Sequence, residues 1–324
     1  MDDKISKDLL DLYVDAQHYG VDEFCDESLK TIKRFLPFDS AIVAEGHKTG
    51  KSVVAASVHL HNQPIEKWWD YQDIRNIDPA AHQATTNPGA IITYDSAYAP
   101  RGKEFSFFRD YLKTYEVSHA LLTFTASKAN FKNTHKLRAI SLWRANEKRP
   151  YSPQEQHLAS RLFDHVLRAR ELNQHTVLSS QSPDNLVQTL ICTRAGYVLV
   201  CDTTVSLLLR DEWPGWEPPL LPQKLLISIF SSKNLSYQGH SLGAVARPLG
   251  KNFVISLRPH VSMSGLTQAE SNVARLAATP MSYKEVAIQV GVSESTIRNQ
   301  LHSVYQKLGL KSKAELTALF SNKY

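Results

Sequence analysis

The sequence predicts an α+β protein of several domains, in which two mixed α/β domains precede a domain that is all helical. The chain has 324 residues, which is enough for two or three domains with buried cores. Strand and helix patterns alternate through the part between residues 37 and 258. From residue 264 onward only helix patterns and helix-capping residues occur.

The first domain, residues 1–172, is expected to be a sheet with helices on both faces, an α/β/α layering. Residues 1–36 carry two amphipathic helix patterns rich in Asp and Glu, which we interpret as a solvated face, with a docking surface as the alternative. The last helix begins with Ser152-Pro153-Gln154-Glu155, a capping box. Strands are expected at 39–45, 52–61, 90–94, 119–126 and 137–144, and further helices at 64–76, 105–115 and 152–172.

The segment from Gly46 to Ser52 partly matches a phosphate-binding loop. It has three residues between its glycines where the motif needs four, and it joins two strand patterns instead of a strand and a helix. A hairpin turn is therefore the better interpretation. His59 and His61 share a strand face, but no further residue shows metal-ligand spacing, so no metal site is predicted.

Candidate ligand-binding residues gather in and after the aromatic helix pattern of residues 64–76. A small-molecule site is usually an apolar pocket with a few polar groups, and tyrosine and tryptophan combine both properties. The alternative is that these rings pack in the core. The candidate pocket residues are Trp69, Tyr71, Asp78 and Tyr94.

A polar stretch divides the first domain from the second. Residues 173–185 contain a proline and few apolar residues, so they are predicted to be a linker. Residues 186–261 then form a smaller α/β module, in which Trp213 and Trp216 are expected to cover an edge. Its elements are an apolar run at 186–193, a strand at 197–201, helices at 203–210 and 222–230, and a hairpin at 243–258.

The tail, residues 264–324, contains four helix starts marked by capping residues. Thr267, Ser282 and Ser312 are each followed three residues later by a glutamate, the pattern of a capping box. Ser293, followed by an acidic residue, marks the remaining start. Four short helices are therefore expected.

A tight turn separates the second of these helices from the third. Val290-Gly291-Val292-Ser293 is short enough to force a steep crossing, and glycine suits a positive φ. This is the pattern of a helix-turn-helix. In the third helix, residues 294–308, apolar residues recur at spacings of four, three and four, and Gly309 is placed to end the helix. The apolar stripe consists of Ile297, Leu301, Val304 and Leu308.

The opposite face of the third helix carries side chains that can read DNA. Arg298, Asn299 and His302 can bond the edges of guanine and adenine in the major groove. The tail has seven Lys and Arg against four Glu, a net charge of +3 in a chain of +5, which suits a specific binder. A helical bundle whose polar face is only solvated is the alternative. Phosphate contacts are expected from Lys284, Ser295, Thr296 and Lys307.

Residues 266–316 resemble the DNA-binding domain of LuxR-type (NarL/FixJ-like) bacterial transcription regulators. Thr279-Pro280 and Gln300 depart from the family pattern. Arg298 stands where the family has a lysine, so a planar guanidinium with several donors replaces a single ammonium group. The resemblance implies a homodimer on an inverted repeat of double-stranded DNA, with the helix at 312–320 helping to pair the copies. The family elements stand here as Leu266-Thr267, Glu270, Lys284-Glu285-Val286-Ala287, Ser293, Thr296-Ile297-Arg298 and Lys307-Leu308-Gly309.

The element order of residues 1–172 resembles a GAF-like or autoinducer-binding sensor domain, and residues 186–261 resemble a PAS-like module. In LuxR-type quorum-sensing receptors a Trp, a Tyr and an Asp-Pro pair contact an acyl-homoserine lactone. Asp78-Pro79 matches that pair, whereas Ile65 stands in the place of the tryptophan and Trp69 in that of the tyrosine. The resemblance implies a small-molecule signal without identifying it.

These observations predict a ligand-responsive, sequence-specific DNA-binding transcription regulator, which contacts RNA polymerase if it is an activator. The alternatives are a protein-interaction scaffold or anti-activator of the same fold, and an orphan quorum-sensing receptor. No catalytic motif occurs, so neither an enzyme nor a cofactor is expected. Three cysteines without CxxC spacing, an acidic N-terminal segment and no long apolar run predict a cytoplasmic protein with no membrane partner.

Overall fold

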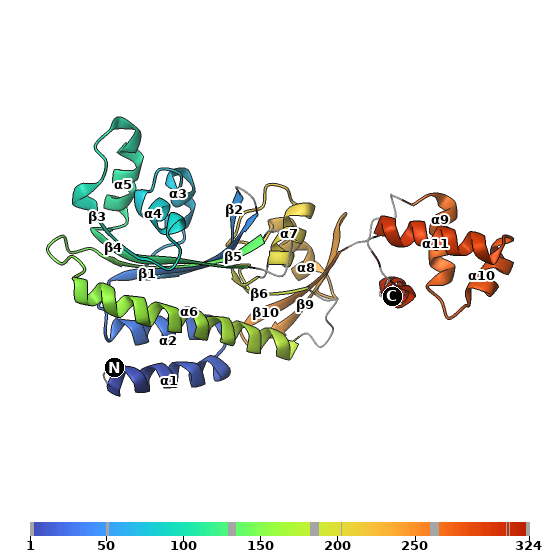
Figure 1. Ribbon diagram of the computed structural model, residues 1–324, viewed down its shortest axis with the longest axis horizontal. Helices are drawn as coiled ribbons and strands as arrows, with labels where there is room; N and C mark the ends of the chain where they lie inside the picture. The colour runs from blue at the N-terminus through green and yellow to red at the C-terminus, as the bar shows by residue number, and fades with distance from the viewer. Residues whose placement is uncertain are drawn as a thin grey trace. The chain divides into compact units, whose positions relative to one another are not determined.

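The computed structural model describes residues 3–49, 52–128, 134–181, 188–201, 203–259, 266–308, 310 and 312–321. The chain divides into two compact units, one made of Met1–Tyr237 with Ala244–Arg258 and the other of Gln238–Gly243 with Pro259–Tyr324. The first, here called the sheet unit, holds two five-stranded sheets. The second, here called the helical unit, holds the last four helices (Figure 1). Because both sheets belong to one unit, the division into a sensor and a middle module stays a prediction.

The first sheet has the strand order β2-β1-β5-β4-β3, and its neighbouring strands pair antiparallel. Thr49 of β1 lies opposite Ser52 of β2, so a hairpin is confirmed in place of a phosphate-binding loop. The predicted strand end at residue 45 was too early, because β1 continues to Thr49. The strands are β1 (Ser40–Thr49), β2 (Ser52–His61), β3 (Ile91–Asp95), β4 (His119–Lys128) and β5 (Thr134–Arg144).

Helices cover both faces of the first sheet, as Figure 1 shows. One face carries α1 (Asp3–His18), α2 (Val21–Lys33) and α6 (Pro153–Gln181). The other carries α3 (Glu66–Ile74), α4 (Pro79–Thr86) and α5 (Ser106–Thr114). The eight-residue α4 was not predicted, because its alanine-rich sequence lacks an apolar period. The core under α6 buries Leu12, Leu29, Leu121, Leu142 and Phe163.

Residues 173–181 are not a linker, because they are the last turns of α6. The prediction was wrong because polar residues here are buried. Asn173 Nδ2 donates to two main-chain oxygens in and just after α1, at 3.0 and 2.8 Å. Gln174 Nε2 donates to a buried glutamate of β1 at 2.7 Å. Polar side chains whose hydrogen bonds are made within the protein can lie inside a core. Composition alone does not distinguish a helix with such side chains from a polar loop. Residues 182–185 lie outside the described residues.

The second sheet has the order β7-β6-β10-β9-β8, which is the order of the first sheet with each strand number raised by five. The predicted hairpin at 243–258 is confirmed, and it turns at Gly250, whose φ is +58°. The three-residue β8 was not predicted. The strands are β6 (Gln188–Thr193), β7 (Val198–Val200), β8 (Ser236–Gln238), β9 (Leu242–Leu249) and β10 (Asn252–Pro259).

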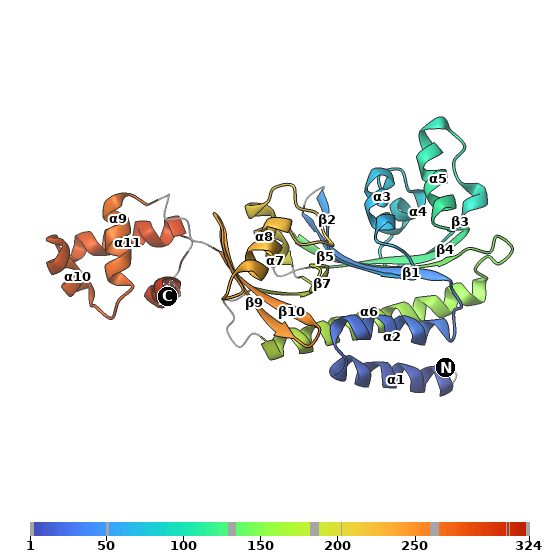
Figure 2. The ribbon, with the colours of Figure 1, turned by 180° about the vertical axis from the view of Figure 1, so that it is seen from behind.

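Helices α7 (Thr203–Glu212) and α8 (Gln223–Ser231) lie against the second sheet (Figure 2). Phe230 of α8 meets Phe253 of β10 edge to face, with ring centroids 4.9 Å apart. The end of α6 packs against the same sheet through Val177 and Leu178. The long α6 therefore contacts both halves of the sheet unit.

The helical unit consists of α9 (Gln268–Ala277), α10 (Tyr283–Val290), α11 (Glu294–Leu308) and α12 (Lys313–Ser321), so the four predicted helices are confirmed. The capping boxes that start α9 and α10 have both reciprocal bonds. Gly291 ends α10 with a φ of +79°, as the turn requires. Gly309 lies outside the described residues.

The apolar stripe of α11 forms the centre of the helical unit. Ile297, Leu301 and Val304 are at most 2% exposed and pack with Val273 of α9 and Val286 of α10. This burial holds α11 against α9 and α10 and leaves the polar face of α11 outside. Within the described part of the chain, no helix combines the length and apolar character that a membrane crossing requires.

Candidate nucleic-acid interface and ligand cavity

The outer face of α11 carries the three residues predicted to read bases. Arg298, Asn299 and His302 are exposed, while the opposite side of the helix is buried against α9 and α10. The separation of the two faces is therefore confirmed. Contact of these three side chains with DNA stays a prediction.

Hydroxyl groups surround the beginning of α11. Ser293 Oγ accepts a hydrogen bond from the Thr296 amide at 3.1 Å, which confirms Ser293 as the N-cap. The hydroxyls of Ser295 and Thr296 lie 2.7 and 2.8 Å from the same oxygen. The positive end of the helix dipole and these donors suit a phosphate group. Lys284 on α10 is exposed as well.

Arg298 is held on the surface by two neighbours. Its Nη2 and Nε lie 2.7 and 3.2 Å from one carboxylate oxygen of Glu294, and its guanidinium carbon lies 5.5 Å from the centre of the Tyr283 ring. The Arg298 side chain is 63% exposed, so this ion pair contributes at most about 1 kcal/mol. A base edge or a phosphate can replace it at small cost.

Lys307 forms an ion pair that the sequence did not predict. Its Nζ lies 2.8 and 2.7 Å from the two carboxylate oxygens of Glu270 on α9. Glu270 also accepts bonds from the Ser303 hydroxyl at 2.6 Å and from the Thr267 amide at 2.7 Å. The bond from Lys307, followed by these two, lowers the pKa of Glu270 to about 2. The Lys307 side chain is still 39% exposed, so its contact with phosphate stays a prediction.

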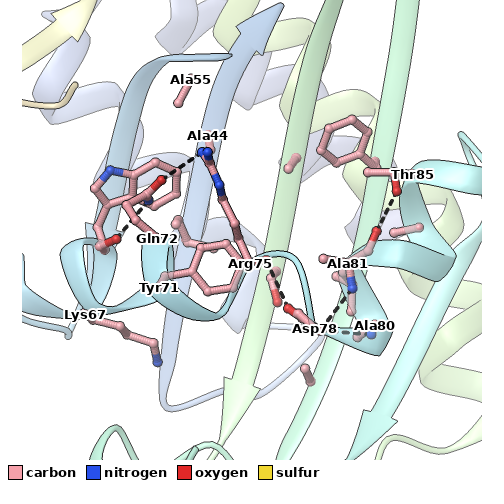
Figure 3. Close-up of a pocket in the computed structure, with 18 of the residues that line it drawn as sticks. Ala44, Ala55, Lys67, Tyr71, Gln72, Arg75, Asp78, Ala80, Ala81 and Thr85 are labelled. Carbon is pink, nitrogen blue, oxygen red and sulfur yellow. Dashed lines mark hydrogen bonds between the residues drawn. The ribbon is translucent and has the colours of Figure 1, made fainter. Parts of the chain in front are cut away.

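The sheet unit contains a cavity of about 570 Å³ between the first sheet and the helices α3, α4 and α5 (Figure 3). Small-molecule sites usually have volumes of about 300 to 1,000 Å³ and mostly apolar walls. Alanine side chains are frequent in these walls and leave the space open. The apolar lining includes Ala44, Ala84, Ala139, Leu122, Leu137 and Phe124.

Three of the four predicted pocket residues line this cavity, namely Tyr71, Asp78 and Tyr94. Trp69 does not, and its side chain is 42% exposed. Its neighbour Trp68 lines the cavity instead, because consecutive residues of a helix point about 100° apart. The sequence identified the correct helix but the wrong tryptophan.

Asp78 caps α4 and is engaged by several donors. Its Oδ1 accepts bonds from the amides of Ala80 and Ala81 at 2.9 and 3.1 Å, and its Oδ2 accepts the Tyr71 hydroxyl at 3.0 Å (Figure 3). Burial raises the pKa of both Asp78 and Tyr71. The carboxylate therefore orients the tyrosine at the cavity wall.

Sequence reasoning missed Lys67, which is 1% exposed and lines the cavity. Its Nζ lies 3.6 Å from the centre of the Trp143 ring and has no hydrogen-bond partner in the described part of the chain. Burial lowers the pKa of Lys67 to about 7. A lysine is seldom buried, so composition indicated a surface residue. The available signal was spacing, because Lys67, Tyr71 and Arg75 recur every four residues on one face of α3.

The second half of the sheet unit reaches the edge of the cavity. Trp68 Nε1 donates to the main-chain oxygen of Pro218 at 3.0 Å, and Glu217 is part of the lining. Glu217 and Pro218 belong to the segment between α7 and α8. The segment between α7 and α8 therefore contacts the cavity wall.

The two histidines of β2 contact an acid rather than each other. Nitrogens of His59 and His61 lie 3.1 and 3.5 Å from one carboxylate oxygen of Asp26. Among the described residues, no group of three or more His, Cys, Asp and Glu side chains is arranged to hold a metal ion.

The four helices, the turn at Gly291 and the exposed polar face of α11 have the arrangement of a helix-turn-helix domain. Residues 264–320 match the GerE family, described as "Bacterial regulatory proteins, luxR family". Residues 264–320 therefore form a LuxR-family domain, and the resemblance found for residues 266–316 is confirmed.

Three solved structures show a more distant similarity. The N-acylhomoserine lactone dependent LuxR family transcription factor CepR2 from Burkholderia cenocepacia has 13% identity and a TM-score of 0.41, over 54% of this chain and 99% of CepR2. SdiA from Escherichia coli has 11% identity and a TM-score of 0.38, over 97% and 95% of the two chains.

The third structure, the LBD domain of VqsR from Pseudomonas aeruginosa, has 14% identity and a TM-score of 0.37, over 53% of this chain and 96% of that domain. No curated protein sequence matches the chain. The identification of the DNA-binding domain rests on the family match over residues 264–320.

Proposed function

We propose that the protein is a ligand-responsive, sequence-specific transcription regulator that inserts α11 into the major groove as a homodimer on an inverted repeat. The observation that carries this proposal is the LuxR-family domain, whose α11 exposes Arg298, Asn299 and His302 on one face. An arginine, an amide and an imidazole on one exposed helix face match the donors and acceptors of base edges. Contact with RNA polymerase belongs to this proposal if the output is activation.

The sheet unit is proposed to be the sensor, with a GAF-like first half and a PAS-like second half. The shared strand order of the two sheets supports a common layered architecture. The cavity of about 570 Å³ supports a small-molecule signal, with Tyr71, Asp78 and Tyr94 among its contacts. The bond from Trp68 to Pro218 supports communication between the two halves.

The experiment compares wild-type and Arg298→Ala proteins by selection from a library of randomised DNA duplexes. A bidentate arginine supplies about 1 to 3 kcal/mol of discrimination at one base pair. Arg298→Ala is therefore expected to remove the base preference at one position of each half-site and to keep the others.

Lys284→Ala is the matched control, because Lys284 is also an exposed cation of the helical unit. This variant should weaken binding to all sequences alike and make the salt dependence shallower by about one counterion. If Arg298→Ala weakened all sequences uniformly and kept every base preference, the assignment of Arg298 as a base reader would be wrong. Wild-type protein without salt-dependent DNA binding would instead indicate a protein-interaction scaffold.

A further inference from the structure

Two buried donors in the cavity have no hydrogen-bond partner among the described residues. Lys67 Nζ and Tyr94 Oη are the side-chain polar atoms of the lining that are buried without a hydrogen bond, among the residues that the structure describes. An ammonium group is a donor only, and a tyrosine hydroxyl can donate. Leaving such groups unpaired is costly, so a ligand that fits this cavity offers acceptor atoms to them.

The surroundings of Lys67 are aromatic. Its Nζ lies 3.6, 5.4 and 5.9 Å from the ring centres of Trp143, Tyr115 and Tyr111. Ring faces attract a cation but replace only part of its hydration. Burial lowers the pKa of Lys67 to about 7, because the charged form loses most of its hydration here.

The three carboxylates that line the cavity already have other partners. Glu45 accepts a bond from a glutamine of α6 at 2.7 Å and lies 3.6 Å from a lysine of β5. Asp78 accepts three hydrogen bonds from its own segment and from Tyr71. Glu217 pairs with an arginine of α7 at 2.9 Å. An acceptor for Lys67 therefore comes from the ligand, and an anionic acceptor would also favour the charged form of the lysine.

The rest of the cavity wall is mixed, with polar members such as His82 and Ser141, and its apolar part suits the body of the ligand. Ala44, Ala84, Ala139, Leu122 and Leu137 present methyl and isobutyl groups and no polar side-chain atoms. Apolar area buried against such a wall contributes to binding in proportion to its extent. A hydrocarbon chain matches this surface better than a sugar or a nucleotide.

We propose that the cavity binds an amphipathic monocarboxylate of the fatty-acid class, with its carboxylate on Lys67 and its hydrocarbon chain along the alanine and leucine wall. This inference rests on the proposed sensing function and names the chemical class of its signal. Tyr94 Oη supplies a second donor to an oxygen of the ligand.

The test measures binding of decanoate and of decanamide to the full chain by isothermal titration calorimetry. The two probes have the same chain length and differ in the charge of the headgroup. A hydrogen bond to a charged group corresponds to about a ten- to hundredfold difference in affinity. Wild-type protein is therefore expected to bind decanoate at least about tenfold more tightly than decanamide.

Lys67→Met is expected to abolish this preference and to keep the affinity for decanamide. Methionine is unbranched and similar in length, and it replaces an unpaired buried cation with an apolar group, so the variant should fold. Arg75→Met is the matched control, because Arg75 is the C-cap residue of α3 and also lines the cavity. Unlike Lys67 it is exposed, and its Nη1 donates to Gln72 Oε1 at 3.2 Å. It should retain the wild-type preference. Ala139→Leu, which narrows the apolar part, should weaken both probes.

Equal affinities of wild-type protein for the two probes, or a preference that persists in Lys67→Met, would overturn the inference. Loss of the preference in Arg75→Met alone would also overturn it, because the anion would then lie on Arg75. Absence of saturable decanoate binding has the same consequence. DNA binding measured on the same preparations separates these results from the proposed function, since it fails only if the regulator assignment itself fails.

Discussion

Lys307 and Glu270 form an ion pair. Removing the Lys307 charge tests whether this lysine stabilises the helical unit or contacts DNA. Lys307→Met leaves the Glu270 carboxylate with its bonds from Ser303 and Thr267 only. The melting temperature of the helical unit is therefore expected to fall, while the salt dependence of DNA binding stays as in wild type. Circular dichroism and gel shifts at several salt concentrations measure the two effects.

Lys284→Met provides the opposite control for this prediction, because Lys284 is exposed on α10. It should leave the melting temperature unchanged and make the salt dependence shallower by about one counterion. If Lys307→Met also made the salt dependence shallower, Lys307 would be shown to contact phosphate.

The same carboxylate predicts how acid destabilises the helical unit. The pKa of Glu270 falls from the ordinary value of 4.5 to about 2 on folding, mainly through Lys307. Because the folded-state pKa is the lower one, the stabilisation is present above pH 4.5 and is lost as the pH falls toward 2. The melting temperature of wild type should exceed that of Glu270→Gln at neutral pH, and this difference should shrink across that interval. A difference independent of pH would mean that Glu270 acts through packing alone.

At the scale of elements, α6 is the helix that packs against both sheets. Asn173 is 1% exposed and donates two hydrogen bonds to main-chain oxygens in and just after α1. Asn173→Ala leaves these buried acceptors unpaired and is expected to lower the free energy of unfolding by about 1 to 3 kcal/mol. Urea titration followed by circular dichroism measures the loss.

His175→Ala is the control for the Asn173 prediction, because His175 lies on the same helix but is exposed. Its effect should stay within about 0.5 kcal/mol, as is usual for surface positions. If both variants had the same stability, the last turns of α6 would not be anchored as the structure shows.

At the scale of the whole molecule, the prediction concerns assembly. One helix-turn-helix reads few base pairs, and a two-fold pair of them matches an inverted repeat. We expect a homodimer in solution or on DNA, with α12 contributing to the pairing. Multi-angle light scattering of the full chain with and without the selected duplex gives the mass directly. Monomers under both conditions would contradict the expectation.

The sequence by itself determined the helical unit almost completely. Its information is local: a capping box needs a residue and its neighbour three positions later, and the stripe from Ile297 to Leu308 needs only the helix period. The same holds for the hairpin that joins β1 and β2 and for the capping box at Ser152. Each of these features depends on residues close together in the chain.

Only the tertiary structure decided which polar side chains lie inside. Lys67 and Asn173 are buried against distant parts of the chain. From the sequence alone, a lysine indicated a surface position and the polar stretch around Asn173 indicated a loop. Lys307 is held by Glu270 from another helix, and Trp68 instead of Trp69 faces the cavity because the sheet fixes the rotation of α3. The physical reason is common to all four: burial and pairing are properties of contacts between segments, and a local pattern does not contain them.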